Sequence, residues 1–297
     1  MAPQHPRPRP EGGSEPDSTG RGLRATERHR SHCTRWAVGY ECPVTSDDVP
    51  TSERSRTRRL ARAAVCAALT ATVLFGVGFL VRSKWDPLIS LDDTAIRAMT
   101  DVTREHPALR DALIVWQEAT QPVKLYVAGT LLCLWVWLVK GYRTRAWWAF
   151  GTMMFAWFVG FSAKLVFQRA RPLVEDPVSE APGYSFPSGH ALNSAAFCTT
   201  VVILLWPLVQ SRAWRAVMVT VAGVVVVLTA LDRTFLGVHY PSDVSVGVLT
   251  GVGLVLASYA GYSGWNPQDH PRTARDPDTT TTGSHRDPVP EESRWRS

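Results

Sequence analysis

Long apolar runs alternate with short polar segments through the middle of the chain. A helix needs about 20 apolar residues to cross the hydrocarbon core of a bilayer. The pattern predicts six such helices, over residues 63–81, 122–139, 147–167, 189–209, 216–231 and 242–259. We therefore expect an all-α protein whose core is a six-transmembrane-helix bundle.

The segments outside these runs are polar. Residues 1–53 and 262–297 are rich in Pro, Gly, Ser, Thr and charged residues and lack a sustained apolar period, which predicts two disordered tails around a domain at 54–261. Residues 82–121 contain no apolar run long enough to span, so one or two interfacial helices outside the membrane are expected there. No apolar stretch lies near Met1, which disfavours a cleavable signal peptide.

Basic residues predict the orientation of the spans. An arginine cluster at 54–62 precedes the first span, and the short loops at 140–145 and 212–215 are also basic. Because short loops rich in Lys and Arg stay in the cytoplasm, these segments and both termini are expected on the cytoplasmic side. Residues 168–188 and 232–242 then lie on the outer face. The chain is thus expected to be a multi-pass protein of the plasma membrane.

The composition agrees with a membrane protein once the two polar tails are considered separately from the apolar middle. The mean hydropathy of −0.06 would suit a soluble protein, but it averages an apolar middle with two polar tails. The chain has 12 Trp, a residue enriched where side chains meet the membrane interface. The net charge is +6, and the partner expected from these features is the bilayer, with no nucleic acid.

Cysteines give little sign of a metal site. Cys66, Cys133 and Cys198 lie in apolar runs and are expected to be small buried hydrophobic residues. Cys33 and Cys42 lie in the N-terminal tail, where two free thiols are favoured over a metal site because their spacing fits no strong zinc pattern.

Three cations lie close to the outer ends of predicted spans. A charge at that depth costs several kcal/mol unless it is paired or reaches water. Each of Lys164, Arg171 and Arg233 could alone be a topological anchor or a snorkelling side chain. Together they suit a phosphate group, because arginine can bond two phosphate oxygens at once and lysine adds a point charge. Three cations also match a dianionic phosphoryl group and its transition state.

The segment Pro187–His190 reads PSGH and leads directly into a predicted span. Pro187 and Ser188 fit a helix start, and Gly189 lets a ligand approach the backbone. Free N–H groups at a helix N-terminus bind anions, and the serine hydroxyl would add a donor. The alternative interpretation is an ordinary capped helix with an interfacial histidine.

His239 and Asp243 are four residues apart. If a helix begins near Pro241, the carboxylate can hold one imidazole nitrogen and leave the other facing the site. A structural contact that caps the last span is the alternative. With His190 on the same face, one histidine could act as a neutral nucleophile and the other as a proton donor to the leaving group.

These segments resemble the type 2 phosphatidic acid phosphatase (PAP2) family, also called lipid phosphate phosphatases, whose pattern is K-x6-RP, PSGH and SR-x5-H-x3-D. The first motif is Lys164–Pro172 and the second is Pro187–His190, and both are complete. The third lies in Asp232–Asp243 and has Asp232 where the family usually has Ser. The resemblance covers roughly residues 63–261.

The resemblance implies a membrane phosphatase with a haloperoxidase-like helical bundle that needs no metal or other cofactor. It implies that His239 is the nucleophile and forms a phosphohistidine, that Asp243 orients it, and that His190 protonates the leaving oxygen. The implied phosphate-binding residues are Lys164, Arg171, Ser188, Gly189 and Arg233. An ionised Asp232 would repel phosphate, so it is not among them and could instead pair with Arg233 or Lys164.

The expected substrate is a lipid phosphomonoester or diphosphate at the outer leaflet. Candidates are a polyprenyl diphosphate, phosphatidic acid and phosphatidylglycerophosphate. A catalytically impaired lipid-phosphate binder or transport-associated protein is an alternative, whose only support is Asp232. A vanadium-dependent haloperoxidase is disfavoured, because those relatives are soluble and this chain has six apolar runs.

Overall fold

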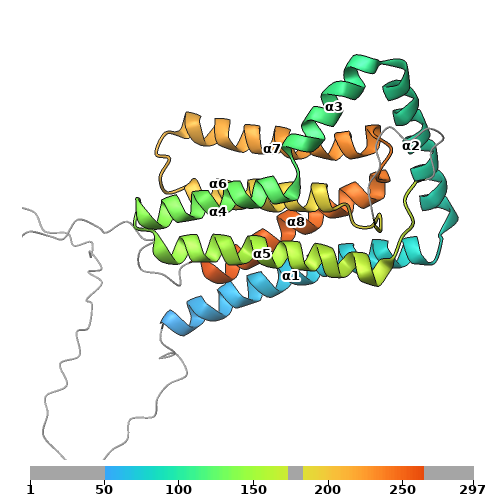
Figure 1. The fold of residues 1–297 in the computed structure, drawn as a ribbon. Coiled ribbons are helices and arrows are strands. Elements are labelled where there is room, and N and C mark those ends of the chain that lie inside the picture. The colour runs from blue at the N-terminus through green and yellow to red at the C-terminus, as the bar shows by residue number, and fades with distance from the viewer. Residues whose placement is uncertain (1–50, 173–182, 264–297) are drawn as a thin grey trace, which may run out of the picture. The chain divides into compact units, whose positions relative to one another are not determined.

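The computed structural model describes residues 51–172 and 183–263, and all regular structure in these ranges is helical (Figure 1). The helices are α1 (Thr51–Arg82), α2 (Asp86–Glu105), α3 (Pro107–Ala119), α4 (Pro122–Leu138), α5 (Arg143–Phe167), α6 (Gly189–Leu205), α7 (Arg212–Phe235) and α8 (Pro241–Tyr262). This confirms the predicted all-α bundle. The predicted disordered tails lie almost entirely outside the described residues, as do Cys33 and Cys42.

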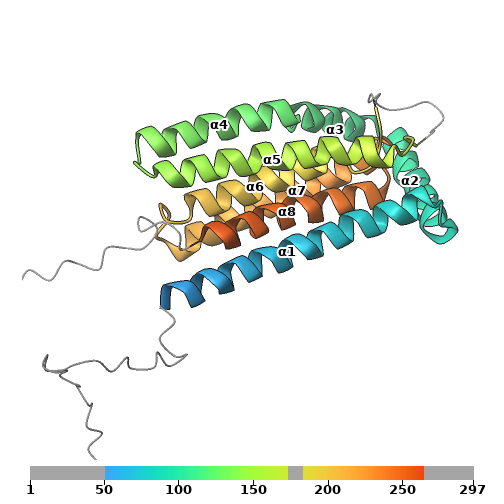
Figure 2. The ribbon, with the colours of Figure 1, turned by 90° about the horizontal axis from the view of Figure 1, so that it is seen from below.

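Helices α1 and α4 to α8 run side by side, α2 lies across one end of the bundle, and α3 connects α2 to α4 and packs beside α7 (Figures 1 and 2). In this arrangement α6 packs against α4, α5, α7 and α8, and α1 packs mainly against α8. The ends of α5 and α7 and the beginnings of α6 and α8 therefore meet at the end of the bundle that α2 covers (Figure 1).

Glycines bring α6 and α8 into close contact. A Cβ atom at Gly251 would lie 2.4 Å from the backbone oxygen of Leu192, and one at Gly247 would lie 2.8 Å from the backbone oxygen of Ser188. Neither position has room for a larger residue. Small residues at helix interfaces allow this close approach in membranes, where van der Waals packing drives association. The start of α6 is thereby fixed against the start of α8.

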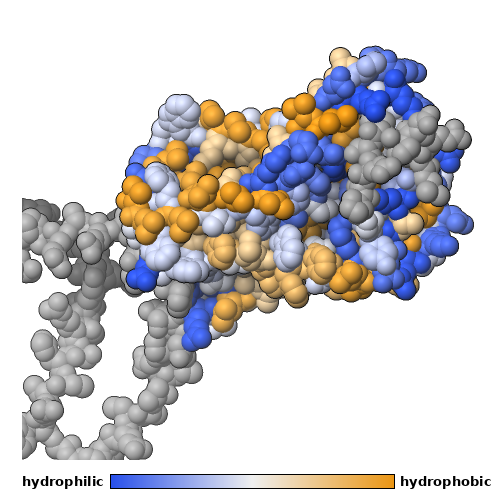
Figure 3. Space-filling view, in the orientation of Figure 1, coloured by the Kyte–Doolittle hydropathy of each residue, from blue (hydrophilic) through white to orange (hydrophobic). Residues whose placement is uncertain are grey.

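Four helices are long and apolar enough to cross a membrane, namely α1, α5, α7 and α8. A fifth span results if α3 and α4, which meet at a bend of 45°, count as one, and α6 is a shorter apolar helix. The predicted number of six spans therefore remains a prediction. Apolar side chains cover much of the bundle's side in Figure 3, where a soluble protein would be polar. These features support a multi-pass membrane protein.

The helix boundaries differ from the predicted spans in ways that have physical causes. The segment predicted to hold one or two interfacial helices forms α2 and α3. Helix α6 ends before Pro207, because proline cannot continue a helical hydrogen-bond ladder, although the predicted span ran to Val209. Helix α7 continues to Phe235, past the predicted end at Leu231, and so includes a buried pair of opposite charges.

One cation of the predicted basic loops is buried. Arg145 is 4% exposed, and its guanidinium donates to the carbonyl oxygens of Ile203 and Leu204 at the end of α6. The last carbonyls of a helix have no partner within the helix, and a cation there also interacts favourably with the helix dipole. Arg145 therefore caps α6 in addition to contributing basic charge.

Candidate active site

The three predicted motifs meet at one end of the bundle. Lys164 lies in the last turn of α5, the PSGH motif begins α6, and Asp243 lies in the first turn of α8. The backbone N–H of Ser188 donates to the carbonyl oxygen of Asp243 at 3.0 Å, which joins the second motif to the third. The first motif joins them through Arg171, whose Nη1 lies 3.2 Å from Nε2 of His239.

The remaining predicted residues occupy the same region. Arg233 lies in the last turn of α7, and the backbone N–H of His239 donates to its carbonyl oxygen at 3.3 Å. Gly189 begins α6 beside the first motif, since a Cβ atom there would lie 3.5 Å from Cε of Lys164. His190 follows it in the first turn. The structure thus brings all eight predicted site residues together, although they are spread over 80 positions of sequence (164 to 243).

His239 lies in the loop between α7 and α8 and is 3% exposed. Its Nδ1 atom is 3.6 Å from Oδ2 of Asp243, which is longer than a hydrogen bond. The hydroxyl of Ser185 lies between the two groups, 3.2 Å from Nδ1 of His239, and donates to Oδ2 of Asp243 at 2.5 Å. A serine therefore bridges the histidine and the carboxylate.

These contacts define the hydrogen-bonding role of each ring nitrogen. Because the hydroxyl of Ser185 donates to Asp243, its oxygen accepts from the N–H at Nδ1 of His239. Nε2 then carries a lone pair, which accepts from the guanidinium of Arg171. Burial lowers the pKa of His239 to about 4, aided by the charges of Arg171 and Lys164, although Asp243 acts in the opposite direction.

We expect a nuclear magnetic resonance titration of the full-length protein to give a midpoint near pH 4 for His239, against about 6.5 for an ordinary histidine. A lowered pKa keeps the ring neutral at physiological pH, and the neutral form is lost only as the pH falls through 4. A midpoint of 6 or above for His239 would contradict the expectation.

Ser185 was not predicted, because a lone serine in a polar link carries no pattern that distinguishes it. It is completely buried, and its only sequence signal is its place two residues before Pro187. We expect Ser185→Ala to lower kcat about fivefold with little change in KM, because one hydrogen bond near the reacting nitrogen is worth about 1 kcal/mol. Ser83→Ala, at an exposed serine, is the matched control for kinetic measurements. An unchanged kcat in the Ser185 variant would show that the bridge has no part in turnover.

Backbone carbonyls hold the cations of the first motif. Lys164 donates to the carbonyl oxygen of Tyr184 at 2.7 Å, and Arg171 donates to those of Gly183 at 3.0 Å and Val238 at 2.7 Å. Burial lowers the pKa of the Arg171 guanidinium, and the nearby charge of Arg233 lowers it further, although Asp243 opposes both. Like charges held this close favour binding of an anion between them.

Asp232 pairs with Arg233, one of the two partners predicted for it. Its Oδ2 atom accepts from both Nε, at 2.8 Å, and Nη2 of the guanidinium, and both side chains are almost fully buried. The remaining guanidinium nitrogen, Nη1, takes no part in this pair. The aspartate thus offsets one positive charge of the site.

Two atoms of the PSGH motif are buried and without a hydrogen-bond partner in the described part of the chain, Oγ of Ser188 and Nε2 of His190. Buried polar atoms nearly always have a partner, so such atoms mark a place for a ligand or water. Their position beside Lys164 and Asp243 fits the anion site predicted at the start of α6.

Two further buried charges at this end, Asp92 of α2 and Arg169, were also not predicted. Arg169 pairs with Asp92 at 2.7 Å and with Asp243 at 2.6 Å. Neither residue has a motif partner at a recognisable spacing, because the contacts join segments 77 and 74 residues apart.

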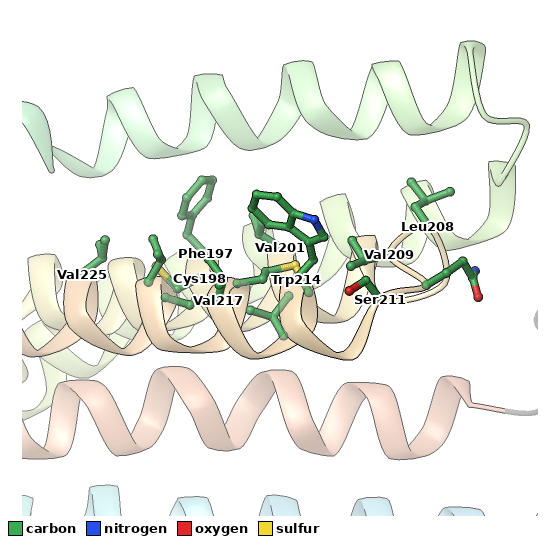
Figure 4. Close-up of a pocket in the computed structure, with 14 residues that line it drawn as sticks. Phe197, Cys198, Val201, Leu208, Val209, Ser211, Trp214, Val217 and Val225 are labelled. Carbon is green, nitrogen blue, oxygen red and sulfur yellow. The ribbon is translucent and has the colours of Figure 1, made fainter.

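An apolar pocket lies elsewhere, between α6 and α7 (Figure 4). Its lining includes Phe197, Cys198, Val201, Trp214 and Val217, and it contains none of the predicted site residues. Cys198 is nine positions from the start of α6, so the pocket faces the part of the helix away from the motifs. Its mostly apolar lining suits lipid contact, and none of the residues that line it is charged.

Comparison with known proteins agrees with the motifs. The PAP2 superfamily matches residues 145–267. The chain is 35% identical over 86 residues to phosphatidylglycerophosphatase B of Bacillus subtilis, covering 29% of this chain and 42% of that protein. It is 36% identical over 125 residues to decaprenylphosphoryl-5-phosphoribose phosphatase of Mycobacterium tuberculosis, covering 40% of this chain and 64% of that protein. The alignments thus span less than two thirds of either relative.

A solved structure shares the fold. It is the crystal structure of a transmembrane PAP2 type phosphatidylglycerolphosphate phosphatase from Bacillus subtilis, with a TM-score of 0.57 and 20% sequence identity. The similarity covers 65% of this chain and 96% of that one. The motifs, the sequence match and the helical architecture agree, and residues 145–267 match the PAP2 superfamily.

Proposed function

We propose that this protein is an integral membrane lipid phosphatase that works through a phosphohistidine and without a metal ion. The observation that carries the proposal is the setting of His239. Its Nε2 atom accepts from Arg171 among the site cations, and its Nδ1 atom is held through Ser185 by Asp243. A neutral imidazole held in this way is a suitable nucleophile for phosphorus.

When the substrate binds, Arg171 donates to a phosphoryl oxygen in place of Nε2 of His239. In the first step, the freed lone pair on Nε2 attacks the phosphorus atom, and the bond from phosphorus to the leaving oxygen breaks. His190, which takes up a proton when the dianionic phosphate binds beside it, gives that proton to the leaving oxygen. Asp243 stabilises the positive charge that develops on the His239 ring, through Ser185. The lipid alcohol or lipid monophosphate leaves, and the phosphoryl group stays on His239.

In the second step, water attacks the phosphohistidine. His190, now neutral, takes a proton from the water, and the bond between phosphorus and nitrogen breaks. Inorganic phosphate leaves, and both histidines return to their starting forms. Lys164, Arg171 and Arg233 neutralise the phosphoryl oxygens in both steps, together with the N-terminus of α6. These fixed cations supply the charge that a metal ion supplies in other phosphatases.

The proposed substrate is a lipid phosphomonoester or diphosphate at the outer face. The site lies at the end of apolar helices, so a substrate whose tail stays in the bilayer can present its phosphate there. A polyprenyl diphosphate, phosphatidic acid and phosphatidylglycerophosphate remain the candidates, and the names of the relatives add a lipid-linked sugar phosphate. The basic loops support cytoplasmic termini and an outward-facing site.

A lipid-phosphate binder without turnover is the second candidate function. The observation in its favour is the pairing of Asp232 with Arg233, which takes positive charge from the phosphate site. The presence of both histidines and of the held carboxylate Asp243 favours catalysis instead.

We expect Asp232→Asn to strengthen competitive inhibition by inorganic phosphate roughly tenfold, or about 1.4 kcal/mol. The substitution keeps the shape of the side chain and removes the charge that offsets Arg233. Inhibition constants of phosphate for both proteins check this, with Asp101→Asn as the control at an exposed aspartate. Weaker inhibition in the Asp232 variant would mean that the carboxylate aims Arg233 at phosphate rather than opposing its charge.

Phosphate release by the detergent-purified protein tests the function. The substrates are undecaprenyl diphosphate, phosphatidic acid and phosphatidylglycerophosphate, each with excess EDTA, and His239→Ala is the blank. Release that survives EDTA and is absent in the variant supports a metal-independent histidine phosphatase. If no lipid is hydrolysed but the same lipids bind, the binder function is favoured instead.

A further inference from the structure

Helix α2 contributes a buried carboxylate to the region of the site, although it carries none of the three motifs. Asp92 is 1% exposed. It accepts from Nη2 of Arg169 at 2.7 Å, and from the backbone N–H at 3.0 Å and the hydroxyl of Ser242. An ionised carboxylate is almost never buried unless it is paired and hydrogen-bonded, and Asp92 meets both conditions.

Arg169 connects Asp92 to Asp243. Its Nη1 atom donates to Oδ1 of Asp243 at 2.6 Å and to the hydroxyl of Ser242 at 2.8 Å, while Nη2 donates to Asp92. Its guanidinium also lies over the ring of Tyr240, 4.0 Å from the ring centre. The pKa of Arg169 is raised, because the two carboxylates outweigh its burial. The guanidinium is thus held by Asp243 at Nη1, by Asp92 at Nη2 and by the Tyr240 ring on one face.

The two oxygens of Asp243 are held from opposite directions. Oδ1 accepts from Arg169, and Oδ2 accepts from the hydroxyl of Ser185 and from the backbone N–H of Tyr240 at 3.1 Å. The contact to Ser185 is the one that reaches His239. A rotation of the carboxylate away from Arg169 would therefore also move the oxygen that supports the histidine. Without Asp92, one edge of the Arg169 guanidinium would have no anion to hold it.

We propose that Asp92 is a positioning residue for the phosphatase reaction: through Arg169 it fixes Asp243, and so the Ser185 bridge to His239. The inference rests on the proposed function, because it assigns Asp92 to the support of the nucleophile. It makes α2 a working part of the site in addition to a cover over the end of the bundle. The contact from Asp92 to Ser242 spans 150 residues and also fixes the start of α8.

The test compares Asp92→Asn with Asp101→Asn, which removes the same charge at an exposed position of α2. We expect Asp92→Asn to lower kcat roughly ten- to hundredfold, the usual cost of misplacing a reacting group by about 1 Å. KM should stay within about twofold, because the phosphate-binding cations do not contact Asp92. Unchanged kcat, or an equal loss in Asp101→Asn, would overturn the proposal.

A second comparison separates positioning from general stability. Arg169→Gln is expected to lower kcat by a similar factor, and adding Asp92→Asn to it should change kcat less than about threefold, because the other contacts of Asp92, to Ser242, do not reach Asp243 or His239 directly. If the double variant lost kcat by the product of the two single losses, the proposed action of Asp92 through Arg169 would be refuted. If Asp92→Asn does not fold, Arg169→Lys replaces it, since one ammonium cannot reproduce the planar fork that joins two carboxylates. Wild-type kcat in Arg169→Lys would then overturn the proposal.

A measurement that does not depend on turnover distinguishes failure of the positioning role from failure of the proposed phosphatase function. In full-length protein with ¹⁵N-labelled histidine, the ring signals of His239 are assigned as those that are lost in His239→Ala. These signals should shift in Asp92→Asn, or in Arg169→Lys, and stay in place in Asp101→Asn. A shift in a protein that hydrolyses none of the lipids would support the positioning role and reject the phosphatase function. Unshifted signals in an active protein would reject the positioning role alone.

Discussion

His239→Ala is expected to lower phosphate release by about 10⁴-fold or more, the loss typical of removing a covalent nucleophile. The reason is chemical: alanine has no lone pair to attack phosphorus, and within residues 51–172 and 183–263 no other nucleophilic nitrogen is held by both Arg171 and the Ser185–Asp243 pair. The measurement is phosphate release from the preferred lipid. A parallel experiment traps radiolabelled phosphate on the protein by denaturation at alkaline pH, and the variant should retain none.

The matched control for this prediction is His106→Ala, because His106 is exposed at the junction of α2 and α3. It should keep wild-type kcat. The melting temperature of His239→Ala should show that the protein is folded, since the expected loss is of a reacting atom. Wild-type rates in His239→Ala would refute the nucleophile assignment. Slow release with label still trapped would instead place the covalent bond on another residue.

Motif spacing predicted a set of residues that the structure brings together at one end of the bundle, but it gave no information about the residues that hold them in place. Lys164, Arg171 and His239 could be predicted because each lies at a fixed distance from other chemical residues along the chain. Ser185 and Arg169 could not be predicted, because their partners are 54 to 77 residues away and only folding brings them together. Supporting residues are defined by three-dimensional contacts, and these leave little periodicity in one sequence.

The apolar pattern predicted the presence of helices more reliably than the residues at which they begin and end. It identified the apolar core of α7 but not its last turn, because Asp232 and Arg233 look like residues of a polar loop. In the structure they neutralise each other while buried, so the helix continues through them. A hydropathy pattern treats each charge separately, and an ion pair between neighbours removes much of the cost that the pattern implies.

His190→Ala is expected to lower kcat on lipid phosphates about 10³-fold, within the range for loss of a general acid. Nε2 of His190 is buried without a partner in the described part of the chain, beside the start of α6 where phosphate would bind. Its proposed task is to protonate a poor leaving group, the oxygen of a lipid alcohol or phosphate. The kcat for a substrate whose leaving group needs no proton should therefore fall less. One such substrate is p-nitrophenyl phosphate.

The test compares the loss of kcat for the lipid phosphate with the loss of kcat for p-nitrophenyl phosphate. We expect kcat for p-nitrophenyl phosphate to fall no more than about 30-fold in His190→Ala, against about 10³-fold for the lipid, because only the proton donated to the leaving oxygen distinguishes them. In His239→Ala both substrates should lose activity equally, since both need the nucleophile. Equal losses in His190→Ala would instead make His190 a phosphate-binding residue. Deprotonation of the attacking water would then need another base, because the cations around the site cannot accept that proton.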